Sequence, residues 1–333
     1  MRKIIAVLAT TALALSLSGC SSVSSTEDMY NQLKSACGDP LKTQETTASV
    51  DAITVSTEAG TPKYEFASPL KGDALQTRVV TEGKGPAITG NQLVQFEFQL
   101  INAGNGKDVQ HSSFNGTDTS DWFLSPDMQI PLCKAMAGVK EGSRAIVFFP
   151  PKIAHENQGV SQFGIGKDDA IIFILDVVKV FLPRAVGNEV SPVSGFPSVV
   201  RAVDGTPGVS IDSNANPPTA ESNGSAAVAT EVLIEGAGDK VKMGDSIVVH
   251  YSGYLWADGT KFDSSWDSKQ PATFTLAEGN LIKGFIDGLV GQKVGSQVVI
   301  IIPPVLGYGN QAQGTIPANS TLVFVVDILG IKG

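Results

Sequence analysis

The chain has 333 residues, which is long enough for two or three domains that each bury a core. Its formal net charge of -9 disfavours nucleic acid as a partner and gives no general attraction to anionic lipid. Short turn clusters drawn from 35 glycines and 18 prolines separate runs of valine and isoleucine, a pattern that predicts β-structure with few long helices.

Residues 1–19 are predicted to be a signal peptide and not part of the fold. Arg2 and Lys3 form a basic n-region, and the apolar run at residues 4–17 is too short for a typical membrane span. The run ends in Leu-Ser-Gly-Cys, which resembles a bacterial lipobox. That resemblance implies cleavage before Cys20 and lipidation of its thiol. An ordinary secretory signal is the alternative.

Residues 20–74 are interpreted as the lipidated cysteine, a polar tether and a lead-in segment. A short helix is expected around residues 29–36, because Gly38 and Pro40 follow as stop signals. Cys37 and Cys133 are the remaining thiols, and in an exported protein they can form a disulfide. Cys133 lies in an apolar segment, so a buried free thiol is the alternative. The sequence has no Cys-x-x-Cys or His-x-x-x-His spacing, so no metal or other cofactor is expected.

The rest of the chain repeats itself once. Four blocks recur in the same order: Glu82–Gly85 with Glu235–Gly238, Lys140–Ser143 with Lys293–Ser296, Ile146–Pro151 with Val299–Pro304, and Ile172–Asp176 with Val323–Asp327. Gly-Thr-Pro also occurs at both 60–62 and 205–207. This repetition predicts two tandem domains, at residues 75–182 and 230–333. Residues 183–229 are rich in Pro, Ser and Asn and are interpreted as a linker, whose second part is expected to be flexible. Residues 198–203 alternate weakly and can instead add a strand to one of the two domains.

Hydrophobic patterns in the second domain predict six strands and one helix. The strands are expected near Glu231–Ile234, Ser246–Leu255, Lys261–Ser264, Ala272–Leu276, Gln297–Ile302 and Thr321–Leu329. The helix is expected over Leu281–Leu289, where five apolar residues fall on one stripe. Antiparallel strands packed over one short helix make an α+β domain.

The expected hairpin at residues 248–266 carries the candidate chemistry, because it can present Tyr251, Phe262 and Asp263 together. With the motifs that follow it, the whole second domain resembles the FKBP-type peptidyl-prolyl cis/trans isomerases. The resemblance implies that the family's proline pocket is formed here by Tyr251, Phe262, Asp263, Leu281, Ile282, Phe285, Tyr308, Ile316 and Phe324. Ala272 stands where many members have an aromatic, and Phe285 replaces the usual tryptophan; we expect both changes to tune the pocket without abolishing it.

These residue types suit rotation about an Xaa-Pro bond, whose barrier of about 18–20 kcal/mol comes largely from amide resonance. A dry aromatic pocket accepts the pyrrolidine ring and favours the twisted, less polar amide, so no nucleophile is required. Tyr251, Asp263 and Tyr308 are the candidate catalytic residues. Asp263 is expected to orient Tyr251, with polarisation of the amide as the alternative role. The Tyr308 hydroxyl and the Ile282 N–H are expected to donate to substrate carbonyls.

The first copy is expected to keep the frame and lose the site. In our alignment of the two copies, Gln110-His111 stand in place of Phe262-Asp263, His155 in place of Tyr308 and Leu132 in place of Phe285. The counterparts of Ile316 and Phe324, which are Ile165 and Phe173, persist. A polar Gln110 in place of an aromatic ring would remove apolar area that binds proline. The first copy is therefore predicted to be catalytically inert, acting as a client-binding domain or a spacer.

Together these features predict a peptidyl-prolyl isomerase that assists the folding of exported proteins. It is expected to be lipid-anchored at the extracytoplasmic face of the cell membrane. Its expected partners are Xaa-Pro segments of client proteins and the membrane, with macrolide inhibitors as candidate ligands. The alternative is a non-enzymatic lipoprotein whose domains bind clients or a partner, but the intact residue set of the second copy favours the enzyme.

Overall fold

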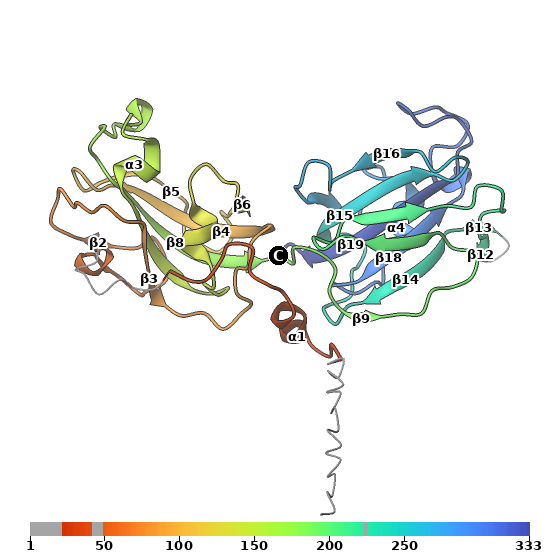
Figure 1. Cartoon of the computed structure of the whole chain (residues 1–333), viewed down its shortest axis with the longest axis horizontal. Coiled ribbons are helices and arrows are strands. Elements are labelled where there is room, and N and C mark those ends of the chain that lie inside the picture. The colour runs from red at the N-terminus through yellow and green to blue at the C-terminus, as the bar shows by residue number, and fades with distance from the viewer. Residues whose placement is uncertain (1–21, 42–48, 223–224) are drawn as a thin grey trace, which may run out of the picture.

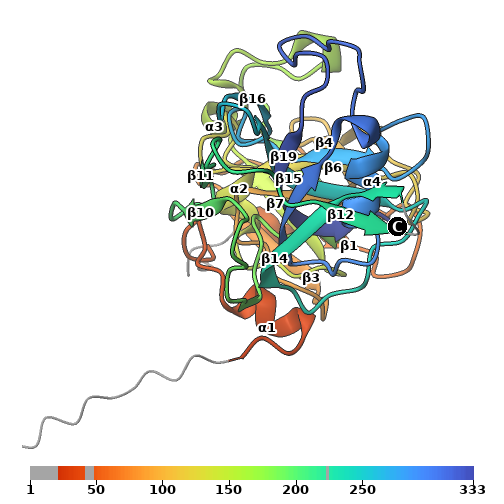
Figure 2. The ribbon, with the colours of Figure 1, turned by 90° about the vertical axis from the view of Figure 1, so that its right-hand side faces the viewer.

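The computed structural model describes residues 22–41, 49–222 and 225–333, which form two large antiparallel sheets side by side (Figure 1). In Figure 2 the sheet of the C-terminal half (residues 183–333) lies in front of the sheet of the N-terminal half (residues 49–182). The predicted signal peptide at residues 1–19 and the predicted lipidation site Cys20 lie outside the described residues. Over the described ranges, no helix is both long and apolar enough to span a bilayer.

The sheet of the N-terminal half has the strand order β3-β7-β8-β4-β5, and β6 pairs with β4 beside β5. The strands are β3 (Gln76–Thr81), β4 (Gln92–Asn102), β5 (Lys107–His111), β6 (Ser120–Leu124), β7 (Arg144–Phe149) and β8 (Ile171–Val180). The helix α2 (Leu132–Met136) packs its apolar side chains on one face of this sheet. A second short helix, α3 (Pro151–His155), and a 3-10 turn, η2 (Ser161–Phe163), lie between β7 and β8.

The sheet of the C-terminal half has the order β16-β15-β19-β18-β14-β9, and β17 pairs with β15. The strands are β9 (Asn188–Glu189), β14 (Ala229–Glu235), β15 (Ser246–Leu255), β16 (Lys261–Ser264), β17 (Ala272–Thr275), β18 (Gln297–Ile302) and β19 (Leu322–Ile331). Read from β5 to β3, the first sheet has the same topology. The expected α+β class with antiparallel sheets and few helices is confirmed, and all six strands expected between residues 231 and 329 are present.

The helix expected from Leu281 begins two residues later, as α4 (Lys283–Leu289). Ile282 has extended backbone angles and forms the N-cap. Two glycines one turn apart face β18, because a Cβ atom at Gly284 would lie 2.3 Å from Ile302 and one at Gly288 would lie 2.5 Å from Ile300. Only glycine at these positions lets the helix lie this close to the sheet.

Residues 183–229, interpreted as a linker with a flexible second part, fold into hairpins, and the weakly alternating segment at residues 198–203 supplies one of their strands. They contain the hairpins β10 (Ser198–Arg201)–β11 (Pro207–Ser210) and β12 (Ala220–Ser222)–β13 (Ser225–Ala227). Phe196, Val199 and Val209 of this segment pack on the face of the C-terminal sheet that is opposite α4. That face carries Val299 and Val325 among other apolar residues, so it has to be covered.

A second cover lies on the matching face of the N-terminal sheet. It consists of the 3-10 turn η1 (Ser49–Ala52) and the hairpin β1 (Thr54–Val55)–β2 (Tyr64–Glu65), whose apolar residues pack against β7 and β8. The repeated Gly-Thr-Pro lies in the turn of the first cover hairpin, at residues 60–62, and runs from the turn into β11 in the second, at residues 205–207. The repeated unit therefore includes a cover hairpin as well as the sheet.

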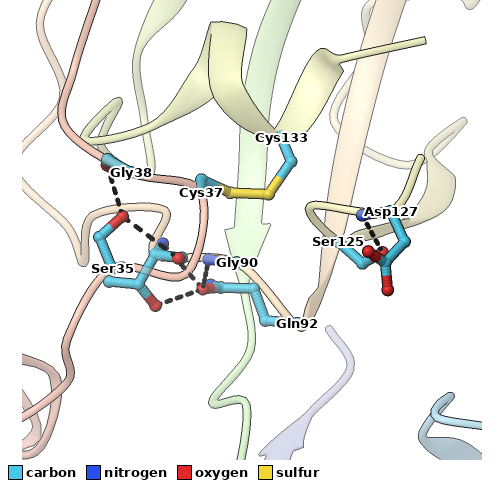
Figure 3. The surroundings of a disulfide bond; sticks show 9 residues. Ser35, Cys37, Gly38, Gly90, Gln92, Ser125, Asp127 and Cys133 are labelled. Atoms are coloured by element: carbon cyan, nitrogen blue, oxygen red, sulfur yellow. Dashed lines mark hydrogen bonds between the residues drawn. A yellow bond between two sulfur atoms is a disulfide. The ribbon is translucent and has the colours of Figure 1, made fainter. Parts of the chain in front are cut away.

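Residues 22–37 differ from the tether expected there, because they pack against both halves of the chain. The helix α1 (Thr26–Asn31) buries Met29 completely between Phe181 and Leu329 and their neighbours. The Tyr30 hydroxyl donates to the Val180 carbonyl at 2.6 Å. A disulfide joins Cys37 to Cys133 at the start of α2 (Figure 3). Residues 22–37 are thus fastened to the junction of the two halves.

We expect a chain that begins at residue 230 to unfold at a lower urea concentration than one that begins at residue 183. Losing the cover exposes Val299, Val325 and their neighbours, and burying one such side chain contributes about 1.5–3 kcal/mol, so the total loss should exceed about 3 kcal/mol. Circular dichroism in urea measures it. Val200→Asp in the longer chain is the control, because Val200 is 71% exposed. Equal midpoints for the two chains would show that the cover contributes nothing.

Candidate functional site

Five aromatic rings from five elements meet on the α4 face of the C-terminal sheet. This C-terminal aromatic cluster consists of Tyr251 (β15), Phe262 (β16), Phe274 (β17), Phe285 (α4) and Phe324 (β19). Neighbouring ring centroids lie between 5.1 and 6.4 Å apart. The structure therefore brings together the four aromatic residues expected there, and it adds Phe274.

Phe274 was missed, although the sequence carried the signal. Alternation along the expected strand at residues 272–276 places Ala272 and Phe274 on one face. Phe274 lies 5.6 Å from the ring of Tyr251 and 5.6 Å from that of Phe285, so it links the strand ring to the helix ring.

One phenol–carboxylate pair lies at the edge of this cluster. The Tyr251 hydroxyl donates a hydrogen bond to Asp263 Oδ2 at 2.5 Å, across the pairing of β15 with β16. Asp263 is exposed, so water screens its charge. Burial of the phenol, and then its hydrogen bond to Asp263, raises the pKa of Tyr251, so that the hydroxyl keeps its proton. This is the contact expected of a carboxylate that orients Tyr251.

The other expected site residues surround the same rings. Leu281 and Ile282 are half-buried and pack against the cluster just before α4, and Ile316 is buried against it in the loop after the 3-10 turn η3 (Pro304–Leu306). The Tyr308 side chain is 38% exposed, and it lies close enough to Tyr251 to contribute to the raised pKa of that residue. Within the described residues the Tyr308 hydroxyl and the Ile282 N–H make no hydrogen bond, so both are available as donors.

His250 points to the opposite face of β15 and is nearly buried. Its Nδ1 lies 2.9 Å from Ser265 Oγ, and its ring stacks on that of Trp266 at 3.9 Å. Ser265 Oγ also accepts the backbone N–H of Tyr251 at 2.9 Å. Burial lowers the pKa of His250 to about 4, so the imidazole is neutral near pH 7. It is a hydrogen-bonded strand residue and does not contact the aromatic cluster.

The register of β5 corrects the alignment of the two copies by one residue. Gln110 pairs with Leu100, and Asp263 pairs with Gly253, at matching positions after matching bulges. Gln110 therefore takes the place of Asp263, and Val109 takes the place of Phe262. The expectation that a polar Gln110 replaces an aromatic ring was wrong. The slip matters because moving one residue along a strand moves a side chain to the other face.

His155 occupies the place of Tyr308, as expected, but both of its ring nitrogens are engaged within its own loop. Nε2 lies 2.8 Å from the Asp169 carbonyl, and Nδ1 accepts the Gly159 N–H at 3.0 Å. Leu132, Ile165 and Phe173 lie in the core of the N-terminal half at the expected positions. The N-terminal half therefore lacks the polar groups that accompany the C-terminal cluster.

An antiparallel sheet and a short helix around an aromatic cluster, with a phenol–carboxylate pair at its edge, define a class of α+β protein suited to binding an apolar ring. A family model described as FKBP-type peptidyl-prolyl cis-trans isomerase matches residues 238–329. FK506-binding protein 1A of Neurospora crassa is 48% identical over 105 residues, which are 31% of this chain and 87% of that protein. An FK506-binding protein of Neisseria meningitidis serogroup B is 46% identical over 102 residues, which are 30% of this chain and 93% of that protein.

FK506-binding protein 2 of Podospora anserina is 48% identical over 92 residues, 28% of this chain and only 50% of that protein. The solved structure of FkpA from Escherichia coli is 38% identical, with a TM-score of 0.31, over 34% of this chain and 51% of that one. The three FKBP domains of wheat FKBP73 are 18% identical, with a TM-score of 0.33, over 78% of this chain and 94% of that one. The chain belongs to the FKBP-type peptidyl-prolyl cis-trans isomerase family, and the matching residues lie in its C-terminal half.

The low pKa of His250 gives a pH dependence with a defined sign. An unfolded chain protonates this ring below its ordinary value of 6.5, whereas the folded chain resists protonation down to about 4. The unfolded state thus binds more protons in this window, and stability should fall as the pH drops through it. When the pH falls from 7 to about 4.5, we expect the free energy of unfolding of His250→Gln to decrease by about 2 kcal/mol less than that of the wild type.

Urea unfolding at both pH values measures this difference. Asp327, whose pKa burial raises to about 6, acts in the opposite direction in both proteins and cancels in the comparison. An identical pH dependence in His250→Gln and the wild type would contradict the assignment.

Proposed function

We propose that the C-terminal half catalyses cis/trans isomerisation of Xaa-Pro bonds in exported client proteins, at the cell envelope. The observation that carries this proposal is the C-terminal aromatic cluster with the Tyr251–Asp263 hydrogen bond at its edge. Proline isomerisation limits folding on a scale of tens of seconds, and exported chains have to fold after translocation. Family membership supports cis/trans isomerisation as the reaction, and a substrate for this reaction has to be a polypeptide that contains an Xaa-Pro bond.

In this mechanism no covalent bond breaks. The pyrrolidine ring packs against Phe262, Phe285 and Phe324, and these rings exclude water from the Xaa-Pro amide that precedes it. A planar amide is more polar than a twisted one, so loss of water favours the twisted state. The Ile282 N–H and the Tyr308 hydroxyl donate to substrate carbonyls and hold the flanking chain while the amide rotates. Asp263 acts through Tyr251, whose ring position it fixes.

We propose further that the two halves are tandem FKBP-like domains, at residues 75–182 and 230–333. Their matching strand order supports this interpretation, and so does the cover hairpin that precedes each domain in the chain, at residues 54–65 and 198–210. The first domain is inert as a catalyst for two reasons. Phe98 takes the place of Tyr251, as its pairing with β8 shows, and it has no hydroxyl. His155 takes the place of Tyr308, but its ring is bonded within its own loop. Macrolide inhibitors remain candidate ligands of the second domain alone.

Substitutions at the phenol–carboxylate pair test the enzyme. In the full chain we expect Asp263→Ala to lower kcat/KM on a short Xaa-Pro peptide about tenfold, because the Tyr251 ring loses its charge-assisted partner. Tyr308→Phe should cause a loss of similar size. A protease-free isomerisation assay measures both. Gln110→Ala is the matched control, since Gln110 holds the same place in the first domain and should leave the rate unchanged.

The rival function is client binding without catalysis. A well-folded wild-type chain that binds the Xaa-Pro peptide but does not accelerate its isomerisation would establish that rival. Equal isomerisation rates for the wild type, Asp263→Ala and Tyr308→Phe would show that the chain is a catalyst but that Asp263 and Tyr308 are not catalytic residues.

We propose that the protein is held at the membrane by lipid on Cys20. The apolar run before it and the Leu-Ser-Gly-Cys sequence support this localisation. Several acyl chains are needed for stable anchoring, since each buried methylene contributes about 0.8 kcal/mol. In cells fed labelled palmitate, Cys20→Ser should abolish label on the protein and shift it from the membrane pellet to the supernatant. Cys37→Ser should keep the label, and a labelled Cys20→Ser chain would refute lipidation at this residue.

A further inference from the structure

The N-terminal half contains an aromatic cluster of its own. This N-terminal aromatic cluster consists of Phe96, Phe98, Trp122, Phe149 and Phe173. The Trp122 ring lies 5.4 Å from that of Phe98 and 5.9 Å from that of Phe173, and Phe149 meets Phe173 edge-on at 6.0 Å. Although the cluster is apolar, Phe98, Trp122 and Phe173 are only half-buried. Ring surface therefore remains open to solvent on a domain with an otherwise complete core.

The strand registers place this open surface where the C-terminal cluster lies in the other half. Phe98 pairs with Leu175 as Tyr251 pairs with Val326. Trp122 pairs with Val94 as Phe274 pairs with Ile247. The two faces thus have rings at equivalent positions, and Val109 on β5 lies half-buried at the place of Phe262.

The two clusters differ in their polar groups. Phe98 lacks the phenol hydroxyl of Tyr251, and Gln110 is neutral where Asp263 is charged. His155 offers no free ring nitrogen, because the Asp169 carbonyl and the Gly159 N–H occupy both. The N-terminal cluster retains surface that can contact an apolar ring and lacks the groups that would hold and polarise the adjacent amide.

We propose that the N-terminal aromatic cluster is a second, non-catalytic subsite that binds a proline ring of the same client chain. Proline suits a surface without polar groups, because it has no backbone N–H that would need an acceptor. Its ring also packs flat against aromatic faces such as that of Trp122. This subsite rests on the proposed function, since it takes the polypeptide substrate of the C-terminal half.

A second subsite affects long substrates and short ones differently. An unfolded client can contact both clusters at once, so binding at one raises the effective concentration of the client at the other. A tetrapeptide is too short to bridge the two halves. The N-terminal cluster should therefore enhance isomerisation in an unfolded protein and leave tetrapeptide turnover as an internal reference.

Trp122 allows the subsite to be observed directly in the full chain. The other two tryptophans lie outside both clusters, since Trp256 packs under the C-terminal cover and Trp266 stacks on His250. Titration with an Ala-Leu-Pro-Ala peptide should change the fluorescence of the wild type, and Trp122→Phe should abolish the change. The same peptide with alanine in place of proline should give no change. No response to the proline peptide, or an equal response to both peptides, would overturn the proposal.

Val109→Asp gives the second measurement, because it places a carboxylate where the bound ring would exclude water. We expect binding of the proline peptide, followed by Trp122 fluorescence, to weaken about tenfold. We also compare kcat/KM on an unfolded protein whose folding is limited by proline with kcat/KM on a tetrapeptide. The ratio of the first to the second should fall by a similar factor. Val79→Asp is the matched control, since Val79 is a 42% exposed valine on the opposite edge strand β3.

The outcomes separate this subsite from the catalytic proposal. Unchanged peptide response and unchanged kcat/KM ratio in Val109→Asp would refute the subsite. Absence of tetrapeptide turnover in the wild type would refute catalysis, while the Trp122 response would still report whether the N-terminal cluster binds proline. Circular dichroism in urea shows whether Val109→Asp is folded, and the Trp122 response of the wild type does not depend on that variant.

Discussion

The structure depends on burial of the central strands on both faces. Every residue of β7 and β18 is buried, and β19 is buried at all but its last residue. One short helix covers one face of each sheet, so the other face needs a second layer. The cover hairpins β1–β2 and β10–β11 supply this layer. Because these hairpins cover one face of each sheet, the face beside the helix can present half-buried aromatic rings. In the C-terminal half these rings lie near β15 and β16, at one edge of the sheet.

Buried polar residues at equivalent positions fasten the two covers by different chemistry. In the N-terminal half, Arg144 forms a two-pronged contact with Asp176 at 2.6 and 2.7 Å, and it also donates to the Ser56 carbonyl of the cover at 2.8 Å. The hydrogen bond to Asp176 is the main reason that the pKa of Arg144 is raised. A buried charge is tolerated there because it is paired.

The C-terminal half has neutral donors in the same place. Asp327 accepts from Gln297 Nε2 at 2.7 Å and from the Ala185 N–H of the cover at 2.8 Å, with no cation in direct contact among the described residues. Burial without a paired cation raises its pKa to about 6. Both halves thus place a carboxylate of the last strand at the cover, half-buried as Asp176 in the first and buried as Asp327 in the second, but only the first pairs it with an arginine.

The sequence predicted the strands and four rings of the C-terminal cluster because those signals are local: alternation, turn residues and helical spacing. It did not predict the covers as a layer, because the weak alternation at residues 198–203 indicates a strand without indicating which domain it joins, and the Pro-rich composition around it is typical of a linker. The continuous apolar runs of β18 and β19 carried the missing signal, because a strand covered on one face would alternate. The alignment of Gln110 failed for another reason. The repeated blocks on either side, at residues 82–85 and 140–143, recur 153 residues further along, and the same offset places Gln110 at Asp263 and Val109 at Phe262, so the constant offset carried the signal.

The N-terminal aromatic cluster indicates that binding of a ring and polarisation of an amide are separable in this fold. Ring contact requires only side chains that share one face of strands β4, β6, β7 and β8, which core packing already favours. Polarisation requires a hydroxyl, a carboxylate and free donors in the loops, none of which stabilises the core. A domain that served only as a spacer would gain from covering Trp122 and Phe173, because exposed aromatic area is unfavourable in water. Their partial exposure therefore argues for a binding surface.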